Sequence, residues 1–162
     1  IDSRGAVAAS SSIDDYTTSK GLDAAPVTPS MIKLPSGVRY ADLKLGTGAE
    51  VKLGSRVTLQ WVLRRSNGYF VDSSQAQNFD PFVFEVGSGA AIAGLDEGIR
   101  GVRQGGVRRL VIPIASGFTA PLDRSGGPVP NGFGPRRQIE RELQKIDPYN
   151  YFFLECEVTR VR

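Results

Sequence analysis

The chain contains 162 residues, of which 40% are hydrophobic, and its formal net charge at pH 7 is only +3. This length and composition predict one domain of ordinary size, and no apolar run approaches the length that a membrane-spanning helix needs. There is no histidine and only one cysteine, which leaves neither a zinc site nor a Ser-His-Asp triad. We therefore expect no metal and no cofactor.

Residues 1–36 differ in composition from the rest of the chain. They are rich in Ser, Ala, Thr and Asp and show no sustained apolar period, which is typical of an extended or disordered arm. We predict such an arm ahead of a domain over residues 37–162. The missing initiator methionine suggests a processed chain whose targeting segment has been removed. A docking arm and a plain linker are both open as its role.

Short strands are predicted to follow the arm, beginning at residues 37–45. Alternation of apolar with other residues is typical of a strand that has one buried face, and it occurs in four further sets: Val57, Leu59, Trp61 and Leu63; Phe82, Phe84 and Val86; Leu110 and Ile112; Phe152, Leu154, Cys156 and Val158. The dipeptide Asn67-Gly68 is typical of a hairpin turn. Cys156 falls within the last alternating set, so we expect a buried small hydrophobe rather than a reactive thiol.

One helix is predicted between these strands. Its apolar residues recur at helical spacing, so that they form a stripe that can lie across a sheet: Ile92, Leu95, Ile99 and Val102. The expected fold class is therefore α+β, an antiparallel β-sheet curled around a single central α-helix.

Four segments, in this order, resemble the FKBP-type peptidyl-prolyl cis-trans isomerases. They are NGYFVDSS (67–74), PFVFEVG (81–87), AIAGLDEGIRGVRQGGVRRLVIP (91–113) and YFFLECEVTRV (151–161). The resemblance runs from about residue 37 to the end of the chain, and residues 92–113 are its most specific part. It implies an isomerase that acts on proline-containing proteins without a cofactor.

Such an isomerase needs a pocket that works by shape and dryness. Resonance gives the peptide C–N bond double-bond character and a rotation barrier of roughly 18–20 kcal/mol. An apolar cleft that removes water from the X-Pro bond and holds it twisted weakens that resonance. Transition-state binding is then sufficient, without a nucleophile, a metal or a proton relay.

The resemblance also implies which residues surround the proline. It gives Asp72, Phe82, Ile92 and Phe118 as catalytic residues, and Trp61, Val71, Ala91, Leu95 and Leu154 as substrate-binding residues. In the family, the backbone amide at the position of Ile92 donates to a substrate carbonyl. Phe82 matches the aromatic wall of the family's pocket, and Asp72 matches its rim acid.

Several of these positions depart from the family. It usually has tyrosine at Trp61, phenylalanine at Val71, tryptophan at Leu95, tyrosine at Phe118 and phenylalanine at Leu154. The pocket stays apolar but loses much of its aromatic wall, and Phe118 lacks a hydroxyl whose hydrogen bond would contribute about 0.5–1.5 kcal/mol net. We therefore expect isomerase activity that is detectable but low, with weak binding of rapamycin-like macrolides.

Asp72 has two interpretations. A carboxylate in a strand context needs a partner if it is buried, which favours the functional rim acid. It could instead cap a turn by pairing with Ser73 or Ser74.

A long flap insert is predicted at about residues 113–149. Within it, Pro135 can occupy a helix start and Ile139, Leu143 and Ile146 fall on one face, so we expect a short helix. Its outer face presents Arg136, Arg137 and Arg141, which we predict to bind a partner, although a merely solvated helix is an equal alternative. Because acids are interspersed among the arginines and no nucleic-acid motif occurs, an acidic protein surface is the expected partner rather than nucleic acid.

Three stretches look most like the FKBPs of the chloroplast thylakoid lumen in plants and green algae: RRSNGYFV (64–71), RQGGVRRLVIP (103–113) and FGPRR (133–137). That resemblance implies a thylakoid-lumen location and a group that includes assembly factors and fixed subunits of photosynthetic membrane complexes. Two functions follow. The first is a low-activity isomerase that assists folding or assembly of lumenal proteins. The alternative is a non-catalytic module that binds a thylakoid membrane complex.

Overall fold

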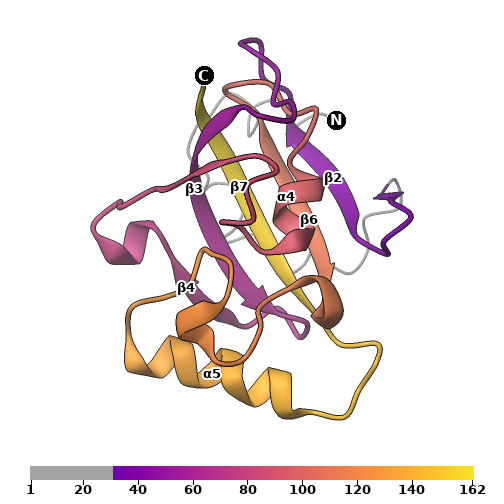
Figure 1. Cartoon of the computed structure of the whole chain (residues 1–162), viewed down its shortest axis with the longest axis vertical. Coiled ribbons are helices and arrows are strands. Elements are labelled where there is room, and N and C mark those ends of the chain that lie inside the picture. The colour runs from indigo at the N-terminus through magenta and orange to yellow at the C-terminus, as the bar shows by residue number, and fades with distance from the viewer. Residues whose placement is uncertain (1–30) are drawn as a thin grey trace, which may run out of the picture.

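A seven-stranded antiparallel sheet forms the centre of the computed structural model, which describes residues 31–162 (Figure 1). Its strands are β1 (Ile32–Lys33), β2 (Arg39–Lys44), β3 (Arg56–Arg65), β4 (Phe70–Ser73), β5 (Phe82–Glu85), β6 (Val107–Pro113) and β7 (Tyr151–Val161). They are arranged in the order β1-β2-β6-β7-β3-β4, and β5 also pairs with β3. The helices are α4 (Ala93–Gly98) and α5 (Phe133–Gln144), with short 3-10 turns at Gln75–Gln77, Ile114–Ser116 and Leu122–Arg124. The predicted antiparallel fold with a helix against the sheet is confirmed.

The two longest strands, β3 and β7, supply much of the core. In their antiparallel register Trp61 lies opposite Cys156, and Leu63 lies opposite Leu154. The alternating residues predicted for β3, from Val57 to Leu63, are all buried. Cys156 is buried as well, and its burial raises the pKa of the thiol. The alternation of apolar residues therefore correctly identified the inner face of the sheet.

Helix α4 lies across the inner face, close to β6 (Figure 1). Two glycines allow this approach, because a Cβ at Gly94 would come within 2.6 Å of Ile112 Cγ2 and one at Gly98 within 2.7 Å of Leu110 Cδ2. The helix has only six residues and ends at Gly98. The predicted apolar stripe, which was expected to reach Val102, therefore continues past the end of the helix. Gly101, at φ +91°, adopts a left-handed conformation shortly after this end.

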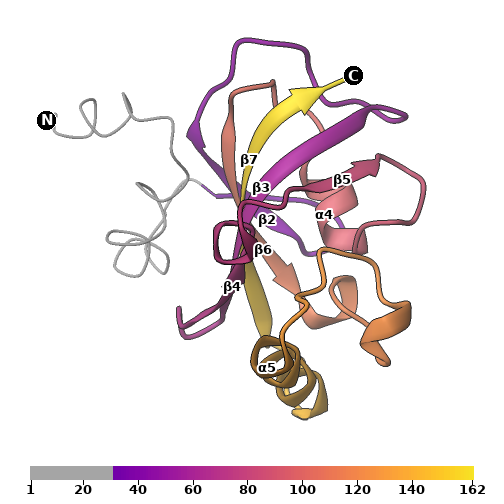
Figure 2. The same ribbon diagram turned by 90° about the vertical axis from the view of Figure 1, so that its left-hand side faces the viewer.

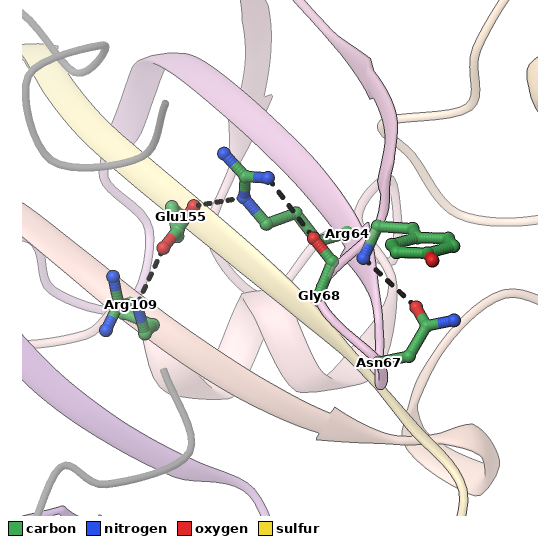
Figure 3. A network of polar contacts seen from close by, with 6 residues as sticks. Arg64, Asn67, Gly68, Arg109 and Glu155 are labelled. Atoms are coloured by element: carbon green, nitrogen blue, oxygen red, sulfur yellow. Dashed lines mark hydrogen bonds and ion pairs between the residues drawn. The ribbon is translucent and has the colours of Figure 1, made fainter. Parts of the chain in front are cut away.

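An ionic cluster lies on the outer side of the sheet and links three strands (Figure 3). Glu155 of β7 accepts a hydrogen bond from Arg64 Nε of β3 at 3.3 Å and another from Arg109 Nε of β6 at 2.6 Å. Arg64 also donates to the carbonyl of Gly68, in the predicted Asn67-Gly68 hairpin turn between β3 and β4. All three ionic side chains are buried, and Glu155 is the charge partner of both arginines.

The sheet begins at Ile32, within the stretch that the sequence analysis assigned to the arm. Ile32 pairs with Tyr40 of β2, and Met31 packs against Val111 and Phe153. The rest of the predicted arm, residues 1–30, lies outside the described residues.

The predicted flap spans residues 114–150, between β6 and β7. Figure 2 shows its loop, in orange, between α4 above and α5 below. The flap carries two 3-10 turns and the predicted helix, α5, which has twelve residues and begins two residues before Pro135.

Candidate functional site

A cavity of about 180 Å³ opens between the sheet and the flap. The core side contributes Trp61 of β3 and Phe82 of β5, and the flap contributes Pro128, Val129 and Asn131. Gln77, Asp80 and Pro81 complete its lining. Aromatic rings and prolines thus form a wall with a few amides at its edge, which suits an apolar ligand that carries backbone polar groups.

The structure brings most of the predicted pocket residues together in one apolar cluster. Buried members of this cluster are Trp61, Val71, Ala91, Ile92, Leu95, Phe118 and Leu154, and the half-buried Phe82 packs against them. Leu95 and Leu154 are 0% exposed and do not belong to the lining of the cavity. Phe82 also stacks on Phe84, with ring centroids 5.2 Å apart.

Phe118 reaches the core from the flap. Its side chain is buried and meets Phe152 edge to face, with ring centroids 5.6 Å apart. This contact makes Phe118 an apolar anchor of the flap. Its predicted catalytic role stays a prediction.

The backbone amide of Ile92 has a partner within the chain itself. It donates to the carbonyl of Gly127 at 2.9 Å, and the amide of Gly127 donates to the carbonyl of Ala90, also at 2.9 Å. Ala91 and Gly127 form a short parallel bridge through these bonds. The flap therefore pairs with the residue that precedes α4, at the amide that the resemblance assigns to the substrate.

The two flap glycines at this contact lie unusually close to the site. A Cβ on Gly126 would fall within 2.6 Å of the backbone of Ala91 and Ile92, and one on Gly127 within 2.6 Å of the Phe82 ring. Contacts this short exclude a side chain at either position while the flap keeps this place. The absence of side chains is what allows the flap backbone to lie against the pocket wall.

Asp72 is buried at the end of β4, and both of its carboxylate oxygens have partners. Oδ1 accepts from the amide of Ser73 at 2.8 Å, and Oδ2 accepts from Gln77 Nε2 at 2.6 Å. Gln77 Oε1 in turn accepts from Asn131 Nδ2 of the flap at 3.1 Å. The pairing with Ser73 foreseen in the turn interpretation is present, but the carboxylate also connects the rim of the pocket to the flap. Sequence reasoning missed both Gln77 and Asn131, because neither belongs to a motif.

Helix α5 is fixed to the rest of the domain through Ile139 and Glu142, which are both buried. Burial on its own raises the pKa of the Glu142 carboxyl. Hydrogen bonds from Lys145 and Asn150 and the charges of Lys145 and Arg65 outweigh this effect, so the pKa lies below its ordinary value. Glu142 is a third residue that sequence reasoning missed, since an acid on a charged helix resembles a solvated one.

The outer face of α5 differs in part from the prediction. Arg137 and Arg141 are exposed, whereas Arg136 is tied to the flap through Asp123 Oδ1 at 2.6 Å and the carbonyl of Pro130 at 3.3 Å. Ile146, predicted to share one helix face with Ile139 and Leu143, lies beyond the helix, which ends at Gln144, and is fully exposed. That part of the prediction is wrong.

Within residues 31–162, no group of three or more His, Cys, Asp or Glu side chains could hold a metal ion. No helix in this part of the chain is long and apolar enough to cross a membrane.

The antiparallel sheet with a short helix against its inner face is the arrangement of the FKBP-like fold, and it carries a cavity lined by Trp61 and Phe82. Comparison with known families agrees, since residues 48–153 match the model of the FKBP-type peptidyl-prolyl cis-trans isomerases. This match covers more than half of the chain, and the chain belongs to that family.

Relatives and solved structures place the chain within this family. It is 40% identical over 111 residues to the chloroplastic peptidyl-prolyl cis-trans isomerase FKBP16-1 of Arabidopsis thaliana, covering 67% of this chain and 52% of that protein. It is 42% identical to chloroplastic FKBP16-3 of the same plant, covering 60% and 43%. The chain thus spans about half the length of these relatives. The crystal structure of AtFKBP13 superimposes with a TM-score of 0.59 at 26% identity, covering 82% of this chain and 99% of that one.

Proposed function

We propose that this protein is a peptidyl-prolyl cis-trans isomerase of low activity that acts on proline-containing proteins. The observation that carries the proposal is the apolar wall of Trp61 and Phe82 around a cavity of about 180 Å³, within a chain of the isomerase family. Such a wall can desolvate an X-Pro bond and favour its twisted transition state. Because Leu95, Leu154 and Val71 offer no aromatic surface, we expect fewer transition-state contacts than in an aromatic pocket.

A proline-peptide assay on the purified 162-residue chain tests this proposal. We expect a rate above the buffer blank but well below that of a strong isomerase, and a loss of that rate in Phe82→Ala. Val83→Ala, an exposed residue on the same strand, is the matched control and should leave the rate unchanged. A rate equal to the blank would contradict catalysis, and a rate equal to that of a strong isomerase would contradict the role of the missing aromatic residues.

We also propose that the protein works in the chloroplast and, more finely, in the thylakoid lumen. Three relatives support the coarser location by name, since FKBP16-1, FKBP16-3 and FKBP16-4 of Arabidopsis are all described as chloroplastic. Detection of the native protein in isolated thylakoids, protected from added protease until the membrane is opened, tests the finer location. Digestion before opening would contradict it.

The second candidate function is a non-catalytic module that docks on a thylakoid membrane complex or assists its assembly. The occupied amide of Ile92 favours it, because a substrate carbonyl finds that donor already bonded. Arg137 and Arg141 favour it too, since α5 is anchored by its opposite side and presents them outward. Identification of the proteins that co-purify with the native chain tests this candidate, and an acidic, stoichiometric partner is the expected result.

A further inference from the structure

The flap occupies groups that the proposed isomerase would need for its substrate. We propose that residues 126–131 of the flap act as an internal ligand of the proline site, so that a proline peptide and this stretch compete for the same place. This inference rests on the proposed function, because it concerns access to the same pocket. It also predicts a behaviour that a permanently open pocket would not show.

The first step of the argument concerns the Ile92 donor. A backbone N–H has one hydrogen to donate, and that of Ile92 already bonds the Gly127 carbonyl at 2.9 Å. The reciprocal bond from Gly127 to Ala90, again at 2.9 Å, fixes this carbonyl in place. A peptide carbonyl can therefore reach the Ile92 amide only by displacing Gly127.

The second step concerns space. The flap backbone leaves no room for a Cβ at Gly126 above Ala91 and Ile92, nor at Gly127 against the Phe82 ring. Gly127 and Pro128 are both buried at this place, and Pro128 shares the cavity lining with Trp61 and Phe82. The flap thus covers both the hydrogen-bond donor and one aromatic wall of the site.

The third step concerns the rim. Asp72 holds Gln77 at 2.6 Å, and Gln77 holds Asn131 of the flap at 3.1 Å. These two side-chain hydrogen bonds hold residues 126–131 at Asn131, the end of the stretch opposite the Gly127 contact. The two groups that the family resemblance assigns to the substrate, the Ile92 amide and the Asp72 carboxylate, are therefore both engaged in holding the flap.

Such a flap can exchange with a ligand because few bonds hold it at the site. A net hydrogen bond in a protein contributes only about 0.5–1.5 kcal/mol, and a prolyl peptide would replace the backbone bond that it breaks. The apparent affinity for a peptide is then the affinity of the open state reduced by the fraction of molecules that are open. A substitution that opens the flap should raise this apparent affinity.

Gly126→Ala is the substitution that tests this directly. Its Cβ would meet the backbone of Ala91 and Ile92, which cannot rotate away as a side chain could. Gly126 is not among the residues with positive φ, so alanine fits its local conformation once the flap moves. The matched control is Gly134→Ala on the same flap, where a Cβ would meet nothing within 4 Å.

Two readouts are needed, and both use the full chain. Hydrogen exchange of the Ile92 amide reports whether the flap is seated, independently of any catalysis. Binding of a short X-Pro peptide and of FK506, a macrolide of the rapamycin-like class, reports access to the pocket. We expect Gly126→Ala to lose Ile92 protection and to bind the peptide and FK506 at least roughly fivefold more tightly, while Gly134→Ala behaves as the unmodified chain. Asn131→Ala, which removes the side-chain link to Gln77 and one amide from the cavity lining, should change both readouts in the same direction by about twofold.

The outcomes separate this inference from the proposed function. If Gly126→Ala binds FK506 more tightly but no variant isomerises the peptide, the flap is an internal ligand and the catalytic proposal fails. If Ile92 loses protection in Gly126→Ala without any gain in binding, or if ligands bind the unmodified chain while the Gly127 amide, which bonds the Ala90 carbonyl, stays protected, the competition is overturned. Should Gly126→Ala fail to fold, Asn131→Ala decides, and no change in either of its readouts overturns the inference.

Discussion

The sheet with α4 and the flap are held in place by different kinds of contact. The sheet is joined by ladders between long strands and by an apolar face against which Leu95 of α4 and Ile99, the residue after α4, are completely buried. The flap is seated by two buried residues of α5, by Phe118 and Leu122, by the two backbone hydrogen bonds of Gly127 and by the side-chain bond of Asn131. Burial of apolar area dominates the first region, and individual polar contacts decide the position of the second.

This difference teaches where regulation can reside. A core that is packed on both sides has little freedom to rearrange, whereas a segment held by a few hydrogen bonds opens at a lower free energy. The walls of the site, Trp61 and Phe82, belong to the core, and the group that covers them belongs to the flap. The shape of the pocket is therefore fixed, and its occupancy is adjustable.

The largest expected effect is in the core. Leu110→Ala removes a fully buried side chain that packs against Gly98 of α4, and we expect the free energy of unfolding to fall by about 2–5 kcal/mol. Urea unfolding measures it, with the exposed Val83→Ala as the control that should change stability by less than about 0.5 kcal/mol. A loss for Leu110→Ala of under about 1 kcal/mol would contradict the comparison, because the core would then be held no more tightly than the flap.

A smaller effect, dependent on pH, is expected at the flap anchor. Glu142→Gln removes the carboxylate that accepts from Lys145 and Asn150, and we expect a loss of about 1–2 kcal/mol at pH 7. Since the pKa of Glu142 is lowered in the folded chain from an ordinary value of 4.5, the folded state binds fewer protons than the unfolded state around that pH. The stabilisation is therefore present above pH 4.5 and is lost as the pH falls further.

Unfolding curves of both chains between pH 7 and pH 3 measure this effect. The stability difference between them should shrink as the pH falls below 4.5. Glu140→Gln, an exposed acid on the same helix, is the matched control and should show no such trend. A difference that stays constant with pH would mean that Glu142 acts by packing and not by charge.

The core was predictable from the sequence because apolar burial follows short-range periodicity. The alternation of Val57, Leu59 and Trp61 predicts the inner face of β3, and the dipeptide Asn67-Gly68 predicts its hairpin. The extent of α4 was overestimated. Ile99 and Val102 continue the apolar spacing, but the left-handed Gly101 does not continue the helix.

The flap contacts were not predictable, because they join residues that no local pattern connects. Nothing in the sequence relates Gly127 to Ile92. Nothing relates Asn131 to Gln77 either, since these two residues are 54 positions apart. The close approach of Gly126 to Ala91 and of Gly127 to Phe82 appears only in three dimensions. Ile146 shows the converse, since its helical spacing suggested burial although the helix ends before it.

A still smaller effect on stability is expected on the outer face of α5. Arg137→Glu combined with Arg141→Glu should change the free energy of unfolding by no more than about 0.5 kcal/mol, because exposed charges contribute little to folding. The same double variant should lose association with the acidic partner proposed above. Arg136 is left unchanged because it holds the flap through Asp123.

Pull-down of the partner with the double variant measures that loss, and Arg160→Glu, an exposed arginine on β7, is the control. If the double variant still associates, the docking surface lies elsewhere on the domain. If Arg160→Glu loses association equally, the partner responds to overall charge and not to α5.

The smallest expected effect, no change at all, sharpens the comparison most. Cys156 is completely buried in β7 beside Trp61 of β3, and its burial raises the pKa of the thiol, so a thiol reagent should react only when the core opens. If the flap moves independently of the core, Gly126→Ala should leave the labelling rate of Cys156 as it is in the unmodified chain. Leu110→Ala should accelerate labelling by the factor that its loss of stability implies, about tenfold for each 1.4 kcal/mol. Mass spectrometry after timed labelling measures both rates. Faster labelling in Gly126→Ala would show that the flap and the core open together, because a reagent can reach the buried Cys156 only when the core opens.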